Sequence, residues 1–257
     1  MDGATEYWHD QRLLSAQARW RGVYGLSKTL ALEASVPFRL VRDRIEFETA
    51  AGAPYAPADP DRHHRNETVS GLADPTLSLQ YGRLAGPWVL ALSAGITLPA
   101  GTTVDNPFAL DRAGLRHQHT QLGAGVASPS FSASASRPFG AWRTHLQGTA
   151  LLPIEENSRG YRPGSRLGLS FSAGRQLVTG WSATLGADFS RENAERWDGN
   201  VEEEGNLGRS DLFLRAAVAT KVGATWAVGL TAQVPVWSDV EGAQIDLPLV
   251  LGLTISR

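Results

Sequence analysis

The 257-residue sequence predicts an all-β fold, a transmembrane antiparallel up-and-down β-barrel, and three observations support this prediction. Apolar and polar residues alternate along most of the chain, as expected when successive side chains of a strand point to opposite faces. The predicted strands reach the length of about nine to eleven residues that a tilted strand needs to cross a bilayer. Short and long connections also alternate, as the periplasmic turns and outer loops of such barrels do.

Eleven strands are predicted in order along the chain. Between Leu30 and Leu40 apolar residues occupy the even positions, while Glu33 and Arg39 fall on the odd ones, and the same two-residue period recurs in the other segments. Four long polar connections, at 43–71, 100–116, 154–163 and 192–208, are separated by brief ones. The predicted strands are 12–24, 28–42, 74–83, 88–99, 117–136, 141–153, 164–176, 181–191, 209–221, 225–237 and 244–256.

Composition and charge exclude several classes of protein. The net charge is −2, so no basic field is available for a nucleic-acid backbone, and we expect no nucleic-acid partner. The chain has no cysteine, which removes disulfides and thiolate metal sites, and we predict no cofactor. Residues 84–104 lack charge over the length of a membrane helix, but Pro87 and Pro99 argue against that interpretation.

Four tryptophans follow short turns and open strands on the apolar face: Trp88, Trp142, Trp181 and Trp226. Indole rings favour the headgroup level of a membrane, so this set predicts an aromatic girdle at the membrane interface. The alternative is a soluble repeat protein such as a propeller. The spacings of 54, 39 and 45 residues are too irregular for blades.

The direction of the strands leads to an expectation about the ends. If the short turns are periplasmic, strands 12–24 and 244–256 both run downward, whereas single-chain bacterial barrels have an even number of strands. We therefore expect twelve strands in a single barrel domain that spans 1–257, with the first strand upstream of residue 1. The sequence also ends on Arg257 rather than on an aromatic residue.

Two motifs resemble a known family. The segment GLADPTLSLQYGRL at 71–84 is similar to a G-L-G-D-x-x-L-x-x-x-Y pattern, and AQVPVWSDVEGAQIDLPLVLGLTIS at 232–256 resembles a closing hairpin of the form Q-x-P-V-Y-x-x-x-x-G-x-Q. Both patterns occur in outer-membrane transporters grouped as phenol-degradation MetA-pathway proteins. Ala73 and Trp237 depart from the family's Gly and Tyr. The resemblance implies an outer-membrane barrel of a Gram-negative bacterium with poorly defined substrates and no agreed catalytic residues.

The inward faces of the predicted strands are polar. A twelve-stranded barrel falls between filled eight-stranded barrels and open porins, so a narrow aqueous passage is plausible. The alternative is a lumen closed by charges that pair across it. Arginine outnumbers acid there, which favours anionic or neutral polar solutes. The predicted lumen-lining residues are Arg19, Glu33, Arg39, Gln80, Arg143, His145, Gln147, Asp188, Asp211, Arg215, Lys221 and Gln233.

Histidine supplies the candidate metal ligands. Alternate positions of a strand would place His117 and His119 on one face, a possible start for a Zn or Cu site. His63 and His64 lie near Glu67 in a long loop, where solvated side chains are the alternative. The acidic loop with Asp198 and residues 202–204 offers oxygen ligands for Ca²⁺, or a surface bridged by divalent ions to lipopolysaccharide.

We predict no catalytic residues. A barrel hydrolase would need a base such as His145 beside Ser128, Ser130 or Ser132, but serine is abundant there and no G-x-S-x-G motif is present. The sequence therefore predicts a passive channel or uptake route for small molecules. The alternative is a closed structural or ligand-binding barrel. Outer-membrane lipid, lipopolysaccharide, the barrel-assembly machinery and a small-molecule solute are the expected partners.

Overall fold

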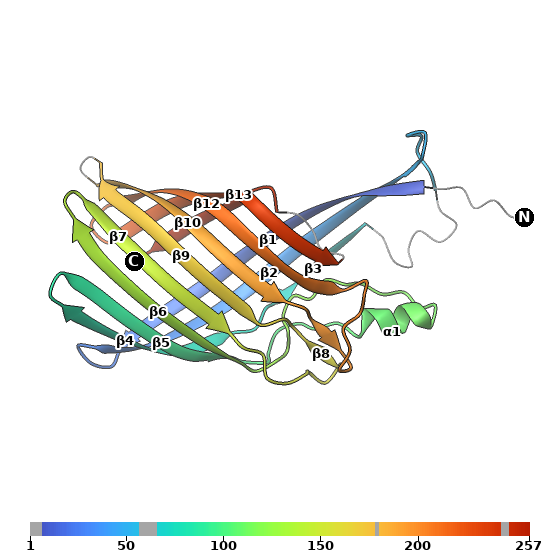
Figure 1. The fold of residues 1–257 in the computed structure, drawn as a ribbon, viewed down its shortest axis with the longest axis horizontal. Coiled ribbons are helices and arrows are strands. Elements are labelled where there is room, and N and C mark those ends of the chain that lie inside the picture. Colours follow the sequence, from blue (N-terminus) through green and yellow to red (C-terminus); the bar gives the residue numbers. More distant parts are fainter. Residues whose placement is uncertain (1–6, 57–65, 178–179, 243–246) are drawn as a thin grey trace, which may run out of the picture.

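The computed structural model describes residues 7–56, 66–177, 180–242 and 247–257, and it confirms the predicted fold class. One antiparallel sheet has the order β1-β2-β4-β5-β6-β7-β9-β10-β12-β13-β14, with β3 paired to β2, so strands adjacent in sequence are neighbours (Figure 1). Its strands are β1 (Tyr7–Gly25), β2 (Leu30–Thr49), β3 (Glu67–Leu72), β4 (Thr76–Ala85), β5 (Trp88–Thr97), β6 (Ser128–Phe139), β7 (Trp142–Leu151), β9 (Arg166–Gln176), β10 (Trp181–Asn193), β12 (Asn206–Val222), β13 (Trp226–Gly242) and β14 (Val250–Ser256).

The twelve strands of this sheet cross it from end to end eleven times, because two of them share one crossing. Strand β3 pairs with 38–43 of β2 and β4 pairs with 30–35 of the same strand, so β3 and β4 are two halves of one pass interrupted at 73–75. Strands β1 and β14 are the two edges, run in the same direction, and are not paired with each other in the described part of the chain. The expected further strand between them stays a prediction.

Several predicted strand boundaries differ from the structure, and the largest differences are in four strands. The strand predicted at 117–136 begins only at Ser128, because 117–127 leaves the sheet and packs against its inner face. The strand predicted at 244–256 begins at Val250, and 243–246 lie outside the described residues. Strands β1 and β2 continue well past the predicted 12–24 and 28–42, and form a two-stranded arm that projects beyond the rest of the wall (Figure 1).

The loop end of the barrel carries the remaining elements. Helix α1 (Pro107–Arg112) begins after Asn106, whose side chain accepts hydrogen bonds from the backbone N–H groups of Phe108 and Ala109. A two-stranded sheet pairs β8 (Tyr161–Arg162) with β11 (Arg196–Trp197). Within the described residues, no helix has the length and apolar character needed to cross a membrane.

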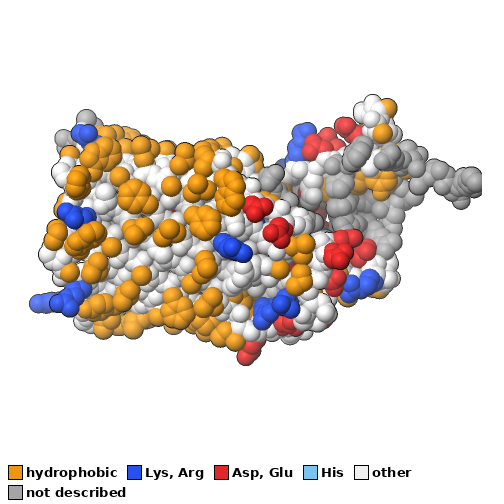
Figure 2. Space-filling model, in the orientation of Figure 1, with side chains coloured by type: hydrophobic (Ala, Val, Ile, Leu, Met, Phe, Trp, Pro, Cys, Tyr) orange, Lys and Arg blue, Asp and Glu red, His pale blue; other side chains and the backbone are white. Residues whose placement is uncertain are grey.

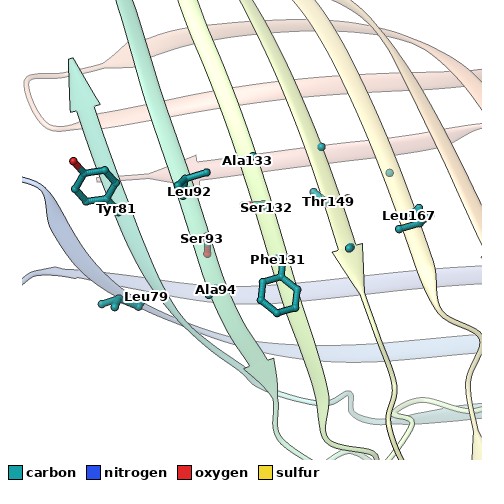
Figure 3. A pocket seen from close by; sticks show the side chains of 13 residues that line it. Leu79, Tyr81, Leu92, Ser93, Ala94, Phe131, Ser132, Ala133, Thr149 and Leu167 are labelled. Carbon is teal, nitrogen blue, oxygen red and sulfur yellow. The ribbon is translucent and has the colours of Figure 1, made fainter. Parts of the chain in front are cut away.

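The outer face of the barrel is apolar. Large side chains such as Leu214, Leu230 and Phe171 are each at least half exposed, and similar side chains cover a broad band of the surface (Figure 2). A continuous apolar surface of this extent marks a membrane-facing region rather than a soluble one. Across β4 to β9 the band contains an apolar groove of about 750 Å³, where Tyr81 and Phe131 stand beside alanine and glycine positions (Figure 3).

Candidate functional site: the inner wall and the loop end of the barrel

The inner face of the sheet is lined by small polar residues over β5 to β9. The strand register aligns Ser93 with Ser132, Ser132 with Thr149, and Thr149 with Gly168. Strand β6 contributes a serine at every inward position from 128 to 136. Hydroxyl groups can exchange hydrogen bonds with water or a solute, and short side chains leave the lumen open, so this wall suits an aqueous interior.

A first charged network lies on the inner face of β1, β2 and β4. Glu33 accepts a hydrogen bond from Nη2 of Arg21 at 2.5 Å and one from the amide of Gln80. The register aligns Ala31 with Gln80 and Arg21 with Ser35, so all three side chains come from adjacent inward positions. This network satisfies one cation and one carboxylate locally, within the wall rather than across the lumen.

A second network centres on Asp188 of β10. Its Oδ1 accepts a hydrogen bond from the hydroxyl of Ser170 at 2.6 Å, and its Oδ2 accepts one from the amide of Gln233 at 2.8 Å. Nε of Arg215 lies 2.9 Å from Oδ2 in an ion pair, although this N–H is not aligned for a hydrogen bond. Nη2 of Arg215 donates to the Ser170 hydroxyl at 3.0 Å. Four strands are therefore joined through one carboxylate.

The other predicted lumen residues also fall at inward positions. Asp211 is buried, where it pairs with Arg209 at 2.7 Å and accepts from Ser238 at 2.8 Å. The register places the remaining ones opposite other inward residues of the neighbouring strand, in the pairs Arg19 with Pro37, Gln17 with Arg39, Arg143 with Gly174, His145 with Ser172, Gln147 with Ser170 and Lys221 with Ala227.

The segment 100–127, which we call the inward segment, packs against the inner face at the loop end. Nη1 of Arg39 donates to the carbonyl oxygen of Leu122 at 3.2 Å, and Thr97 Oγ1 donates to that of Val126 at 3.1 Å. Leu122 and Val126 are almost fully buried. A Cβ atom at inward Gly71 would lie 2.5 Å from the side chain of Thr102, so only glycine permits this approach.

Asp74 fastens both ends of the inward segment. It lies at the interruption between β3 and β4, and its carboxylate accepts hydrogen bonds from the backbone N–H of Gly101 at 2.8 Å, of Ala124 at 2.7 Å and of Gly125 at 3.1 Å. The sequence motif at 71–84 contains Asp74, but its role was missed. The pattern of residues does not reveal that the N–H groups it binds come from positions distant in the chain.

Three loops meet in a small apolar core, which we call the loop cluster, formed by Phe108, Tyr161 and Trp197. The ring of Trp197 lies 4.6 Å from that of Tyr161 and 6.4 Å from that of Phe108, measured between centroids. Ala124 of the inward segment packs against it. The loops at this end of the barrel therefore pack against one another as one structure.

A partly buried carboxyl, Glu195, lies beside the loop cluster. It accepts hydrogen bonds from the Tyr161 hydroxyl at 3.2 Å and from Nε1 of Trp197 at 3.3 Å. Burial raises the pKa of Glu195 above its ordinary value, although these hydrogen bonds oppose the shift. Burial, with the nearby Glu195 charge, likewise raises the pKa of the Tyr161 hydroxyl.

We expect the loop cluster to lose stability as the pH rises through the pKa of Glu195. A carboxyl whose pKa is higher in the folded state binds a proton more readily there than in the unfolded chain, so its stabilising effect is present at lower pH and declines as it ionises. Near-ultraviolet circular dichroism of thermal unfolding at several pH values measures this. Glu195→Gln should reduce the change of the unfolding midpoint with pH. Glu203→Gln, at an exposed position of the same loop, is the control and should leave that change as it is in the unmodified protein. The same pH dependence of the midpoint in the unmodified protein and in both variants would contradict the expectation.

The candidate metal ligands lie in the inward segment. His117 is buried, its Nδ1 lies 3.0 Å from the carbonyl oxygen of Leu115, and its ring centroid is 5.2 Å from that of His119. The two rings are close, but not as alternate residues of a strand, because no strand forms there. Within the described ranges, no group of three His, Asp or Glu side chains suited to a metal is present. A metal at this pair stays a prediction, and His63 and His64 lie outside the described residues.

One serine and histidine pair occurs on the inner wall. Ser136 Oγ lies 2.7 Å from Nδ1 of His145, as cross-strand neighbours of β6 and β7. The partner is thus Ser136 rather than the serines at 128, 130 or 132 considered from the sequence. No carboxylate that orients His145 is found among the described residues. Because β6 has a serine at every inward position from 128 to 136, an inward histidine of β7 meets a serine from the strand register alone.

The predicted girdle tryptophans lie on the outer face at the turn end. Three of them have an arginine side chain over the indole ring, with Cζ 5.0 Å from the ring centroid for Arg137 over Trp88, 5.5 Å for Arg175 over Trp142 and 5.9 Å for Arg257 over Trp226. Arg137 and Arg175 lie on the neighbouring strand, and Arg257 directly follows β14. Trp181 is also exposed, opposite Thr220 in the register.

The up-and-down sheet, its apolar outer band and its polar inner wall define a β-barrel of the outer membrane of a Gram-negative bacterium. Residues 13–244 match the family model described as the MetA-pathway of phenol degradation, and the chain belongs to this family. The resemblance inferred from the two motifs is thus confirmed.

Comparison with solved structures supports the same fold. An outer membrane channel from Pseudomonas putida F1 superposes with a TM-score of 0.64 at 17% sequence identity, and the match covers 96% of this chain and 84% of that one. No curated protein matches the chain.

Proposed function

We propose that the barrel is a passive channel for small polar solutes. The observation that supports this proposal is the inner wall of hydroxyl and glycine residues across β5 to β9, which offers hydrogen bonds without filling the lumen. The membership of the family and the likeness of fold to an outer membrane channel agree with it. Solutes move down their gradients, and size and charge decide which ones pass.

The charges of the inner wall favour anions. Glu33 and Asp188 are paired with Arg21 and Arg215, so these networks add no net charge to the lumen. Among the described residues, no carboxylate forms an ion pair with the inward residues Arg19, Arg143 and Lys221. The lumen therefore has an excess of positive charge.

The inward segment controls access from the loop end. It follows the inner face past Arg39 and Thr97 and narrows the lumen there. A lumen narrowed in this way also supports a second candidate function. In that function the barrel is closed and its loops bind a ligand at the surface.

Planar-bilayer recording and liposome swelling distinguish the two functions. A channel gives conductance steps and swelling with neutral sugars and small organic acids, and the acids pass faster than cations of similar size. Protein that migrates as a folded species on unboiled gels, yet gives neither steps nor swelling, would refute the channel and favour the closed barrel.

The combined variant Arg19→Gln, Arg143→Gln, Lys221→Gln should lose most of the anion preference, because it removes three unpaired cations from the lumen. The reversal potential across a salt gradient measures the preference. The matched control removes three outward cations, Arg83, Arg137 and Arg175, by the same substitution and should leave the reversal potential unchanged. If both variants shift it equally, the inner wall does not set selectivity.

The proposal also covers the solute, the partners of the barrel and its lack of a catalytic role. Small organic acids are the first solutes to test, because the family's description names phenol degradation and the lumen favours anions. Lipopolysaccharide at the acidic loops and the barrel-assembly machinery are the proposed partners beyond membrane lipid. The pair of Ser136 and His145 lines the wall and has no catalytic role.

A further inference from the structure

The short turns form a basic end of the molecule. Five turns, at 26–29, 86–87, 140–141, 177–180 and 223–225, connect the strands at this end, and Glu33 is the only acid within six residues of any of them. Its carboxylate is inward and paired with Arg21. The same intervals contain the cations Arg21, Lys28, Arg83, Arg137, Arg143, Arg175 and Lys221. On the face seen in Figure 2, acidic side chains lie toward the loop end, whereas the charged side chains at the turn end are all Lys or Arg.

Several of these cations face the lipid rather than the lumen. Arg83 is aligned with outward Leu90, Arg137 contacts the ring of outward Trp88, and Arg175 contacts the ring of Trp142. Since the indole lies at the headgroup level, it holds the guanidinium at the same depth.

The contacts of Arg137 and Arg175 with the indole rings leave guanidinium N–H groups that can donate hydrogen bonds to a ligand. A guanidinium stacked on an aromatic face keeps the N–H groups of its edge available for an oxyanion in its plane, and phosphate accepts such bonds in pairs. Nε of Arg137 is itself buried and is not available to a ligand, which leaves the two terminal Nη groups of this guanidinium. In the part of the chain that the structure describes, no carboxylate forms an ion pair with Arg137 or Arg175.

We propose that Arg83, Arg137 and Arg175, with Trp88 and Trp142, bind the headgroup phosphates of anionic phospholipids in the periplasmic leaflet. The short turns place these residues on the periplasmic side, and the basic end complements the negative potential of an anionic lipid surface. The barrel is thereby held at a fixed depth. This inference is independent of whether the lumen conducts.

The test compares the thermal unfolding midpoint, from gel mobility of heated samples, in vesicles of phosphatidylcholine and in vesicles with one third phosphatidylglycerol. The unmodified protein should unfold higher in the anionic vesicles by about 6–12 °C, the sum expected for three surface cations. The combined variant Arg83→Gln, Arg137→Gln, Arg175→Gln should lose most of this difference, and substitution by Lys should retain part of it. High salt should reduce it.

Two controls separate lipid binding from general charge effects. The combined variant Arg12→Gln, Arg112→Gln, Arg191→Gln removes the same charge near the loop end and should keep the full difference. Inorganic phosphate added to phosphatidylcholine vesicles should not raise the midpoint. The proposal is overturned if the turn-end variant keeps the full difference, if the unmodified protein shows none, or if free phosphate stabilises as well as the anionic lipid.

Discussion

Asp74→Ala should release the inward segment and raise the single-channel conductance. The substitution removes the acceptor for the N–H groups of Gly101, Ala124 and Gly125, which join both ends of the segment to the wall. Hydrogen bonds to a charged group each contribute about 1.5–3 kcal/mol, so even partial compensation by water leaves a loss of about 2–4 kcal/mol in the docked arrangement. A loss of that size lowers the ratio of docked to undocked segment by at least about 30-fold.

Planar-bilayer recording measures this change as larger steps with more frequent transitions between levels. The matched control is Asp105→Ala, which removes an exposed acid of the same segment whose partner is the surface residue Arg159. Asp74→Asn keeps one acceptor oxygen and should give a smaller change in the same direction. Conductance of Asp74→Ala equal to that of Asp105→Ala would show that the segment does not limit passage.

Asp188→Ala should give the largest loss of barrel stability among the inner-wall substitutions. It leaves Arg215 without its ion pair and removes acceptors for Gln233 and Ser170. Removing one member of a fully buried pair costs about 3–5 kcal/mol, but both side chains here are about one quarter exposed, so we expect about 2 kcal/mol. The variant should also become more anion-selective, because one positive charge becomes unpaired.

The unfolding midpoint on gels and the reversal potential measure the two effects. The double variant Asp188→Ala, Arg215→Ala should recover selectivity and part of the stability, because it removes the unpaired cation as well. Gln147→Ala, an inward polar position aligned with Ser170, is the control and should change little. A double variant no more stable than Asp188→Ala would show that the unpaired charge is not the cause.

The strands and their faces were predictable because each follows from local alternation. The register between β9 and β10 needs only the short turn at 177–180 and the inward phase of each strand to align polar residues such as Ser170 with Asp188. That is also why the inward positions of Asp188, Arg215 and Gln233 agree with the polar phase of their segments.

The loop end was not predictable in this way. Residues 117–127 alternate well enough to suggest a strand, yet they pack inside the barrel, because Asp74 and Arg39 satisfy their backbone groups in place of a neighbouring strand. Similarly, Phe108, Tyr161 and Trp197 lie in three different loops, and nothing local indicates that their rings meet.

The sequence by itself determined an outer-membrane barrel with eleven passes, a polar inner wall and tryptophans at the turn end, because these follow from a two-residue period and the positions of short turns. Only the tertiary structure decided what each inward charge pairs with, and that the long loop after β5 enters the barrel mouth. Those contacts join residues tens of positions apart, and their free energy depends on distances that a one-dimensional pattern does not contain.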